Sequence, residues 1–250
     1  MTRGRQRHLL LATLLQQRWP QLDADAAAQA ITGGDVVVDG RPVLNPRSLV
    51  AADASVRLAP TVALQGERKL AWALSRFLPN VAARTALDVG ACTGGFTTAL
   101  LDAGAAKVYA VDAGFGQLRG TLRQDPRVVN LERTNLSEID REVIADPIGV
   151  LTVDVSYLSL TSAANQVSAA VDFAPGAELL GLVKPMFELR LATIPASDDR
   201  ESFERALAVA CEGVAQAGWT IVDTDECPVR GNHGAVEFFI HARRVRSSDR

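Results

Sequence analysis

The chain has 250 residues, of which 48% are hydrophobic and 22% are charged. This composition is typical of a globular protein with one large α/β domain and a small appendage. The formal net charge of −3 excludes nucleic-acid binding through bulk positive charge, although it is compatible with a local basic face. The start, MTRGRQRHLLLATLLQQ, lacks a small-residue cleavage site, and no apolar run reaches the ~20 residues that span a bilayer. We therefore expect no signal peptide and no membrane segment.

The cysteines and histidines indicate neither a disulfide framework nor a metal site. The three cysteines are an odd number without metal-ligand spacing, which predicts a cytoplasmic protein. The three histidines are scattered along the chain, so no metal site is expected. One of them, His233 in the loop RGNHGAVEFF, is placed where it would face a substrate or nothing.

Residues 1–60 are predicted to form a small N-terminal α+β module, which a connector and an amphipathic lead-in helix over residues 61–84 join to the rest. One glycine pair and one Asp-Gly dipeptide mark element ends in the module. Its expected elements are helices over residues 9–15 and 23–31, a helix end at Gly33-Gly34, strands at residues 36–38, Val43 and residues 56–58, and a hairpin turn at Asp39-Gly40.

From residue 85 to residue 243 the sequence alternates buried strands with helices, which predicts an α/β domain with a mostly parallel seven-stranded sheet covered on both faces. The last two strands lack an intervening helix and should pair antiparallel at one edge. Residues 244–250 are expected to be a frayed tail. The predicted strands are residues 86–89, 107–112, 128–132, 149–154, 178–184, 220–227 and 235–242, and the predicted helices are residues 95–103, 117–124, 137–144, 162–171 and 200–217.

The stretch DVGACTGGFTTALL, residues 88–101, combines a strand end, a glycine-rich turn and a helix start. Its G-x-x-x-G-G spacing differs from that of a dinucleotide site, and the lysine of a triphosphate-binding loop is missing. The second strand ends in Asp112, about 20 residues on, where it can accept hydrogen bonds from ribose hydroxyls. These features together predict a ligand that contains adenosine but no phosphate, and S-adenosylmethionine is such a ligand.

A simpler interpretation is that the glycines only make a tight strand-to-helix turn. Asp112, at the distance that a ribose requires, argues against it. Cys92 has no histidine near it in the sequence, so we interpret it as a small residue that fills the turn rather than as a nucleophile.

Polar residues stand at strand ends where the sheet would otherwise be apolar. Asp154 ends the fourth strand in VLTVDVSYLSL, and Lys184 ends the fifth in LLGLVKPMFEL. Glu237 lies in the last strand, and Lys69 lies on the lead-in helix, where a lysine is ordinarily a solvated charge. A lysine and a carboxylate at the carboxyl edge of the sheet can hold an alcohol and accept its proton. With a methyl sulfonium in line, this pattern predicts methylation of a hydroxyl.

The block DVGACTGGFTTALLDAGAAKVYAVDAGFGQLRGTLRQDPRVVNLERTNL, followed by VDVSYLSL, LVKPMFE and VEFF, resembles the hemolysin A (TlyA) family of FtsJ-like ribosomal RNA 2′-O-methyltransferases. The resemblance covers nearly the whole chain. It implies a Rossmann-like class I methyltransferase domain that uses S-adenosylmethionine. It also implies an N-terminal module similar to the RNA-binding domain of a small-subunit ribosomal protein, with a cytidine ribose of ribosomal RNA or ribosomal subunits as the target.

The resemblance further implies which residues act. A catalytic Lys-Asp-Lys-Glu tetrad falls on Lys69, Asp154, Lys184 and Glu237. The residues implied to contact the cofactor are Gly90, Ala91, Cys92, Thr93, Gly94, Gly95, Phe96, Thr97, Asp112, Ala113, Asn135 and Asp154.

The N-terminal module departs from the family pattern in its charge. Its second helix, DADAAAQAI, has two aspartates and no basic residue, and residues 1–60 hold seven arginines against five aspartates. The family pattern has a glycine- and lysine-rich loop after Phe187-Glu188, whereas this chain reads LRLATIPASDDRE there. Because RNA affinity comes largely from neutralised phosphates, two hypotheses stay open: a ribosomal RNA methyltransferase with a divergent docking surface, and a relative that methylates a small molecule. No amphipathic or transmembrane element supports a pore-forming hemolysin.

Overall fold

The computed structural model describes residues 7–32, 35–43, 45–58 and 65–244. The predicted helix end at Gly33-Gly34, the first residues of the predicted connector and almost all of the predicted tail therefore lie outside the described residues. The described residues fall into two compact units, one of residues up to 58 with residues 119–125 and the other of residues 65–118 and 126–244.

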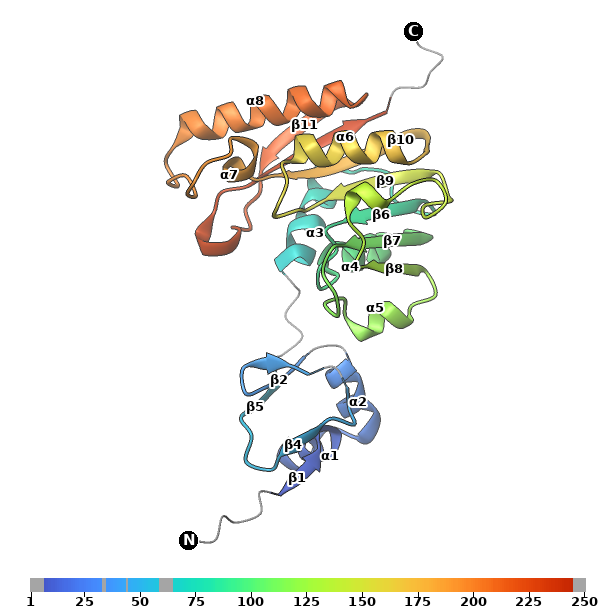
Figure 1. Cartoon of the computed structure of the whole chain (residues 1–250), viewed down its shortest axis with the longest axis vertical. Coiled ribbons are helices and arrows are strands. Elements are labelled where there is room, and N and C mark those ends of the chain that lie inside the picture. Colours follow the sequence, from blue (N-terminus) through green and yellow to red (C-terminus); the bar gives the residue numbers. More distant parts are fainter. Residues whose placement is uncertain (1–6, 33–34, 44, 59–64, 245–250) are drawn as a thin grey trace. The chain divides into compact units, whose positions relative to one another are not determined.

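The N-terminal unit packs two helices against short strands (Figure 1). Leu11, Leu15, Ile31 and Val36 are fully buried in its core. The strands form two small sheets, one of β1 with β4 and one in the order β3-β2-β5. The elements are β1 His8–Leu10, α1 Leu11–Arg18, α2 Ala24–Thr32, β2 Val36–Val38, β3 Arg41–Pro42, β4 Leu49–Ala51 and β5 Val56–Leu58, and α5 Gly120–Gln124 groups with this unit.

The first predicted helix begins two residues too early. Leu9 and Leu10 belong to β1, where Leu9 pairs with Val50 of β4, a strand that the sequence did not predict. A three-residue strand has no periodicity of its own, so the apolar run LLLATLL gave a helix throughout. The pairing of Leu9 with Val50, rather than local propensity, sets where α1 starts.

The larger unit contains the predicted seven-stranded sheet, in the order β11-β12-β10-β9-β6-β7-β8. Neighbouring strands from β10 to β8 run parallel, whereas β12 runs antiparallel to both of its neighbours. The predicted mixed sheet with an antiparallel edge is therefore confirmed. Its strands are β6 Thr85–Val89, β7 Lys107–Asp112, β8 Val128–Glu132, β9 Ile148–Val153, β10 Phe173–Val183, β11 Thr220–Glu226 and β12 Phe238–Arg243.

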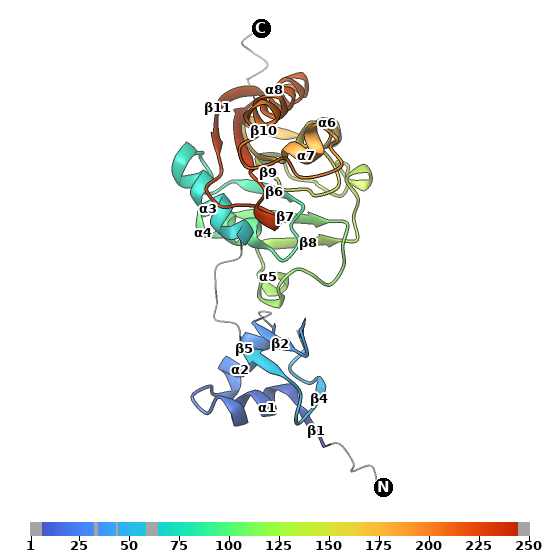
Figure 2. The same ribbon diagram turned by 90° about the vertical axis from the view of Figure 1, so that its left-hand side faces the viewer.

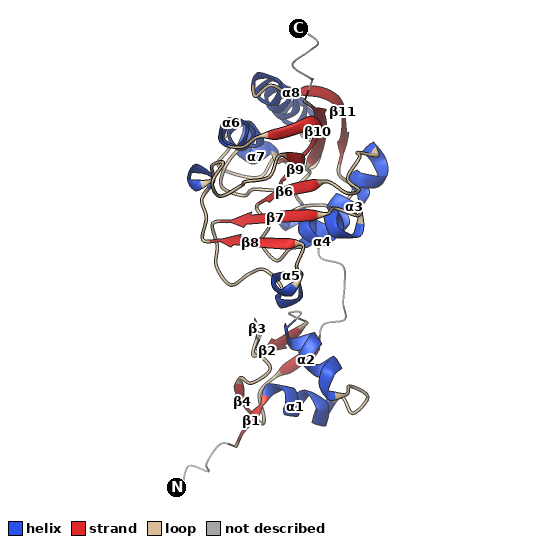
Figure 3. Cartoon of the chain, turned by 90° about the vertical axis from the view of Figure 1, so that its right-hand side faces the viewer, coloured by secondary structure: helices blue, strands red, loops and turns tan. Residues whose placement is uncertain are grey.

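Helices cover both faces of this sheet. Figures 2 and 3 show α3 and α4 on one face and α6 and α8 on the other. Within the part of the chain that the structure describes, no helix combines the length and the apolar character needed to cross a bilayer. The helices and 3-10 turns are α3 Gln65–Phe77, α4 Gly95–Asp102, η1 Leu136–Glu138, α6 Leu160–Ala170, α7 Pro185–Glu188, α8 Arg200–Gln216 and η2 Asn232–Gly234.

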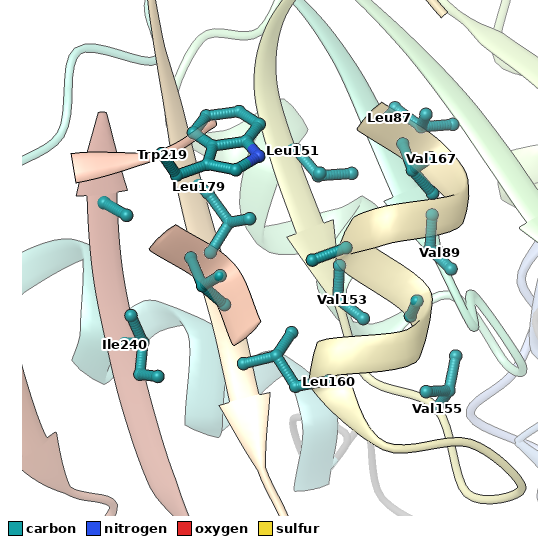
Figure 4. Packing of buried hydrophobic residues seen from close by; sticks show 14 of the residues in the cluster. Leu87, Val89, Leu151, Val153, Val155, Leu160, Val167, Leu179, Trp219 and Ile240 are labelled. Atoms are coloured by element: carbon teal, nitrogen blue, oxygen red, sulfur yellow. The ribbon is translucent and has the colours of Figure 1, made fainter. Parts of the chain in front are cut away.

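The core between the sheet and α6 is built from branched aliphatic side chains (Figure 4). Leu87 and Leu151, from neighbouring strands, and Val167 of α6 are fully buried there, and Trp219 closes one end. This core packs against the strands whose carboxyl ends carry the polar residues predicted above.

The predicted helix over residues 137–144 is wrong. The structure has only the 3-10 turn η1 there, followed by irregular backbone. The carboxylate of Asp140 accepts hydrogen bonds from the backbone N–H groups of Glu142 and Val143, each at 2.9 Å. Such local bonds compete with a helical ladder, and aspartate is therefore a poor helix-interior residue.

Candidate active site

The glycine-rich turn lies at the carboxyl edge of the sheet, between β6 and α4. The backbone N–H groups of Gly90 and Ala91 both donate to the carbonyl of Val111, at 2.9 and 3.0 Å. Gly90 has a φ of +86°, and a Cβ on it would lie 2.2 Å from the carbonyl oxygen of Asp154. No other residue fits there, so the glycine lets this turn pack directly against the strand end that carries Asp154.

Asp112, the last residue of β7, holds the turn from the other side. Its Oδ2 accepts the backbone N–H of Cys92 at 2.8 Å, and its Oδ1 accepts that of Gly114 at 2.6 Å. Each carboxylate oxygen keeps a further lone pair for another donor. The partly exposed carboxylate is thus fixed in place and remains able to accept hydrogen bonds.

The remaining residues implied for the cofactor take different positions. Thr97 is fully buried, and its hydroxyl donates to Asp88 at 2.7 Å. Ala113 is exposed beside Asp112, and Asn135 is exposed at the start of η1, where its N–H donates to Glu138 at 2.6 Å. The Cys92 thiol is exposed and donates to Gln117 Oε1 at 3.1 Å.

The four predicted catalytic residues form two lysine–carboxylate pairs. Lys184, at the end of β10, lies with its Nζ 2.6 Å from Asp154 Oδ1, with side chains 14% and 20% exposed. Lys69 of α3 donates to Glu237 Oε2 at 2.5 Å, and both of these side chains are at least 94% buried. Lys69 is therefore not the solvated charge that a lysine on an amphipathic helix ordinarily is.

The two pairs influence one another electrostatically. Burial raises the pKa of the Glu237 carboxyl above its ordinary value, and the negative charge of Asp154 acts in the same direction. The positive charges of Lys69 and Lys184 oppose this rise in the pKa of Glu237. A carboxyl that responds to three neighbouring charges belongs to a single cluster rather than to a separate structural ion pair.

The glycine-rich turn and both lysine–carboxylate pairs line one cavity of about 320 Å³. This volume is within the range of small-molecule sites. Of the predicted cofactor residues, Gly94, Thr97, Asp112, Ala113 and Asn135 do not line this cavity. The residues that line it are Gln65, Gly66, Lys69, Gly90, Ala91, Cys92, Thr93, Gly95, Phe96, Asp154, Ser156, Lys184, Asn232 and Glu237.

A second cavity, of about 200 Å³, adjoins the first. Its walls are largely apolar and include Met186, Phe187, Ile194 and Val236. Four residues line both cavities, namely Ser156, Lys184, Asn232 and Glu237.

Sequence reasoning missed Ser156 and Asn232, and it left His233 undecided. His233 lines the second cavity from η2, with a φ of +55°. The serine lies in a loop and the asparagine in the short 3-10 turn η2, and no periodicity predicts either segment. Their nearness to Asp154 and Glu237 in the sequence was the available signal.

Comparison with known proteins places these residues in a family context. Residues 65–244 match the model of the FtsJ-like methyltransferase family. The chain is 36% identical over 225 residues to the 16S/23S rRNA (cytidine-2′-O)-methyltransferase TlyA of Mycobacterium tuberculosis. The aligned region covers 87% of this chain and 83% of that protein. The chain is 32% identical to hemolysin A of Brachyspira hyodysenteriae, over 86% of this chain and 91% of that protein.

Solved structures agree with the fold. A protein of Streptococcus thermophilus described as a hemolysin superimposes with a TM-score of 0.69 at 27% identity, over 96% of this chain and 90% of that one. A protein of Listeria monocytogenes, described as an S-adenosylmethionine dependent methyltransferase, shares the fold with a TM-score of 0.51 at 17% identity, over 72% and 99%. The Rossmann-like methyltransferase fold predicted from the sequence is thereby confirmed. The chain belongs to the hemolysin A (TlyA) family of FtsJ-like methyltransferases.

Proposed function

We propose that this methyltransferase transfers the methyl group of S-adenosylmethionine to the 2′-hydroxyl of a cytidine ribose in ribosomal RNA. One observation carries the proposal: the glycine-rich turn and both lysine–carboxylate pairs line a single cavity. The relative from Mycobacterium tuberculosis is a cytidine-2′-O methyltransferase of ribosomal RNA, which supports the same acceptor here. Ribosomal RNA as the substrate would make the enzyme cytoplasmic.

The residues around the turn fit S-adenosylmethionine. Gly90 leaves no side chain between the turn and the end of β9, so backbone can approach a ligand closely. Asp112 would accept the ribose hydroxyls, because its carboxylate is held by two backbone donors and keeps lone pairs. The group, when bound, supplies an electrophilic methyl on a sulfonium.

Lys184 is the residue that we assign to proton transfer. Lys184 Nζ would accept the proton of an acceptor hydroxyl beside it as the hydroxyl oxygen takes the methyl group that S-adenosylmethionine would supply, with S-adenosylhomocysteine as the leaving group. Asp154, 2.6 Å from Lys184, stabilises the ammonium that results. Lys69 and Glu237 line the same cavity and form an ion pair with each other.

The second cavity is the chamber that we assign to the acceptor. It opens next to Lys184 and has apolar walls, which suit the faces of one planar ring. Its volume of about 200 Å³ accommodates a single nucleobase with its sugar at the mouth rather than a stacked duplex. A small-molecule acceptor, the alternative left by the weakly charged N-terminal module, would use the same chamber.

The experiment incubates the full chain with labelled S-adenosylmethionine and ribosomal subunits that lack ribose methylation, across a salt series. We expect transfer to a cytidine ribose, mapped by mass spectrometry of RNA digests, that falls steeply as salt rises. Transfer to no subunit at low salt would contradict the RNA proposal and favour a small acceptor.

Two variants separate donor binding from chemistry. Lys184→Ala should abolish transfer and leave the affinity for S-adenosylhomocysteine, measured by calorimetry, within about twofold of wild type, because Lys184 acts on the acceptor. Asp112→Ala should weaken that affinity by about tenfold or more, the effect of losing hydrogen bonds to a charged group. A fully active Lys184→Ala enzyme would show that the proton acceptor is misassigned.

A further inference from the structure

Ser156 occupies the wall between the two cavities, two residues after Asp154. It lines both the cavity with the glycine-rich turn and the apolar cavity, as Lys184 does. Methyl transfer under the proposed function takes place where donor and acceptor meet, so residues on this wall are nearest to the reacting atoms. Ser156 lies in the stretch VDVSYLSL, but neither a motif nor the family resemblance assigned it a role.

The Ser156 hydroxyl bonds directly to the proposed proton acceptor. Lys184 Nζ donates to Ser156 Oγ at 2.8 Å and lies 2.6 Å from Asp154 Oδ1. Within the part of the chain that the structure describes, Lys184 is the side-chain partner of this hydroxyl, and Lys184 has no third polar partner.

An amine nitrogen is tetrahedral, so two fixed partners determine where its remaining position points. With one partner, the nitrogen can turn about its bond to Cε and its lone pair sweeps a circle. With Asp154 and Ser156 both in place, the remaining position is fixed. The same two partners serve the amine before transfer and the ammonium after it, since both forms can donate to Ser156 Oγ while in contact with the Asp154 carboxylate.

We propose that Ser156 is a positioning residue, which aims the lone pair of Lys184 at the acceptor hydroxyl. The inference rests on the proposed function, because it assumes that Lys184 accepts the proton. A misaimed lone pair slows the transfer step and leaves donor binding and acceptor binding unchanged. The signature of positioning is therefore a fall in kcat at constant KM.

The test compares Ser156→Ala with Ser156→Thr, which keeps a hydroxyl at an exposed position. We expect Ser156→Ala to lower kcat by about 10- to 100-fold, with the KM for ribosomal subunits and the affinity for S-adenosylhomocysteine unchanged. Ser156→Thr should recover most of the lost kcat. A kcat of Ser156→Ala within about twofold of wild type, a rise in KM instead of a fall in kcat, or no recovery with threonine would each overturn the proposal.

Ser159 provides a matched control in the same loop. Its hydroxyl accepts the backbone N–H of Ser162 at 3.1 Å and caps α6, so its role is structural. Ser159→Ala should lower the melting temperature and leave kcat unchanged, the reverse of Ser156→Ala. Equal loss of kcat in both variants would show that the loop merely needs its serines to fold.

A second measurement does not depend on the acceptor. The chain has three lysines, Lys69, Lys107 and Lys184, so labelling with an amine-selective acylating reagent can be followed at each one by peptide mass spectrometry. Ser156→Ala should speed labelling of Lys184 by about three- to tenfold relative to Lys107, because it removes the hydrogen bond to Ser156 that restrains the nitrogen.

The labelling result separates the two proposals. If wild type methylates no ribosomal subunit, the proposed function fails, and the labelling still decides whether Ser156 restrains Lys184. An unchanged labelling rate at Lys184 would overturn the positioning role even in an active enzyme.

Discussion

Lys69 Nζ lies 2.5 Å from Glu237 Oε2, although 168 residues separate them in the sequence. The pair joins the helix that leads into the sheet to the last strand of the sheet. Both side chains are about 95% buried, so each charge depends on the other for its solvation.

Removing one member of this pair should cost more stability than removing both. Lys69→Met leaves the Glu237 carboxylate buried without its partner and should lower the free energy of unfolding by about 3 kcal/mol. Adding Glu237→Leu to Lys69→Met should restore part of that loss, because two apolar side chains of similar size need no mutual neutralisation. Urea unfolding at neutral pH measures both variants, and a double variant that is less stable than Lys69→Met would show that the pair is not coupled.

The buried carboxyl of Asp88 should make stability fall as the pH rises. Burial raises the pKa of Asp88 from 3.8 to about 7, although hydrogen bonds from Thr97 and Thr152 act against the rise. Between about pH 4 and pH 7 the folded state therefore binds more protons than the unfolded state. Its contribution to the free energy of unfolding should decline by on the order of 4 kcal/mol over that window and then level off.

Asp88→Asn isolates this effect from other titrating groups. The variant should keep a neutral group between the two threonines and show a smaller decline in stability between about pH 4 and pH 7 than wild type. Chemical unfolding at a series of pH values provides the curves. Parallel curves for the two proteins would mean that Asp88 titrates in the ordinary range.

Alanine substitutions at two glycines with a positive φ distinguish the cost of backbone strain from the cost of a steric clash. A Cβ at Gly90 (φ +86°) would lie 2.2 Å from the Asp154 carbonyl oxygen, whereas one at Gly116 (φ +73°) would meet nothing within 4 Å. Both alanine variants should lose about 1–2 kcal/mol for the left-handed backbone. Gly90→Ala alone should also weaken S-adenosylhomocysteine binding by about tenfold or more, because it displaces the Asp154 backbone. Calorimetry that finds equal affinities would refute close packing of the turn.

A bulky side chain in the apolar cavity should block the acceptor and spare the donor. Ile194, 37% exposed, lines that cavity and not its neighbour. Ile194→Trp should lower kcat/KM for ribosomal subunits by about 100-fold and leave S-adenosylhomocysteine affinity unchanged. Val209 on α8 is 39% exposed and lines neither cavity, so Val209→Trp is the matched control. Full activity of Ile194→Trp would place the acceptor elsewhere.

The sheet and the strand-end residues were predictable because both depend on local pattern. Buried strands such as 107–112 are short apolar runs between turns, and the carboxyl ends of parallel strands must meet at one edge. Asp154 and Lys184 therefore had to come together once their strands were recognised. Glu237 could be predicted from the family resemblance. The predicted last strand began too early, however: β12 starts at Phe238 and not at residue 235, so Glu237 directly precedes the strand.

What the sequence did not yield depends on contacts between distant segments. Ser156 matters through a hydrogen bond to Lys184, 28 residues on, and no spacing rule predicts the path of the loop between them. Lys69 looked like a surface charge because its partner comes from the other end of the chain. The predicted helix over residues 137–144 was wrong because of one side chain. The Asp140 carboxylate accepts hydrogen bonds from backbone N–H groups that a helix would use.

Because β12 runs antiparallel to β10, it begins at the carboxyl edge of the parallel strands and ends at their amino edge. It pairs Phe238 with Val183 at the end next to Lys184 and Arg243 with Glu178 at the other, and five residues of strand span about 17 Å. A tether attached after Arg243 would therefore start from the edge remote from both cavities. Immobilisation by that end therefore attaches the larger unit away from its cavities, which suits binding assays with the proposed ribosomal substrate.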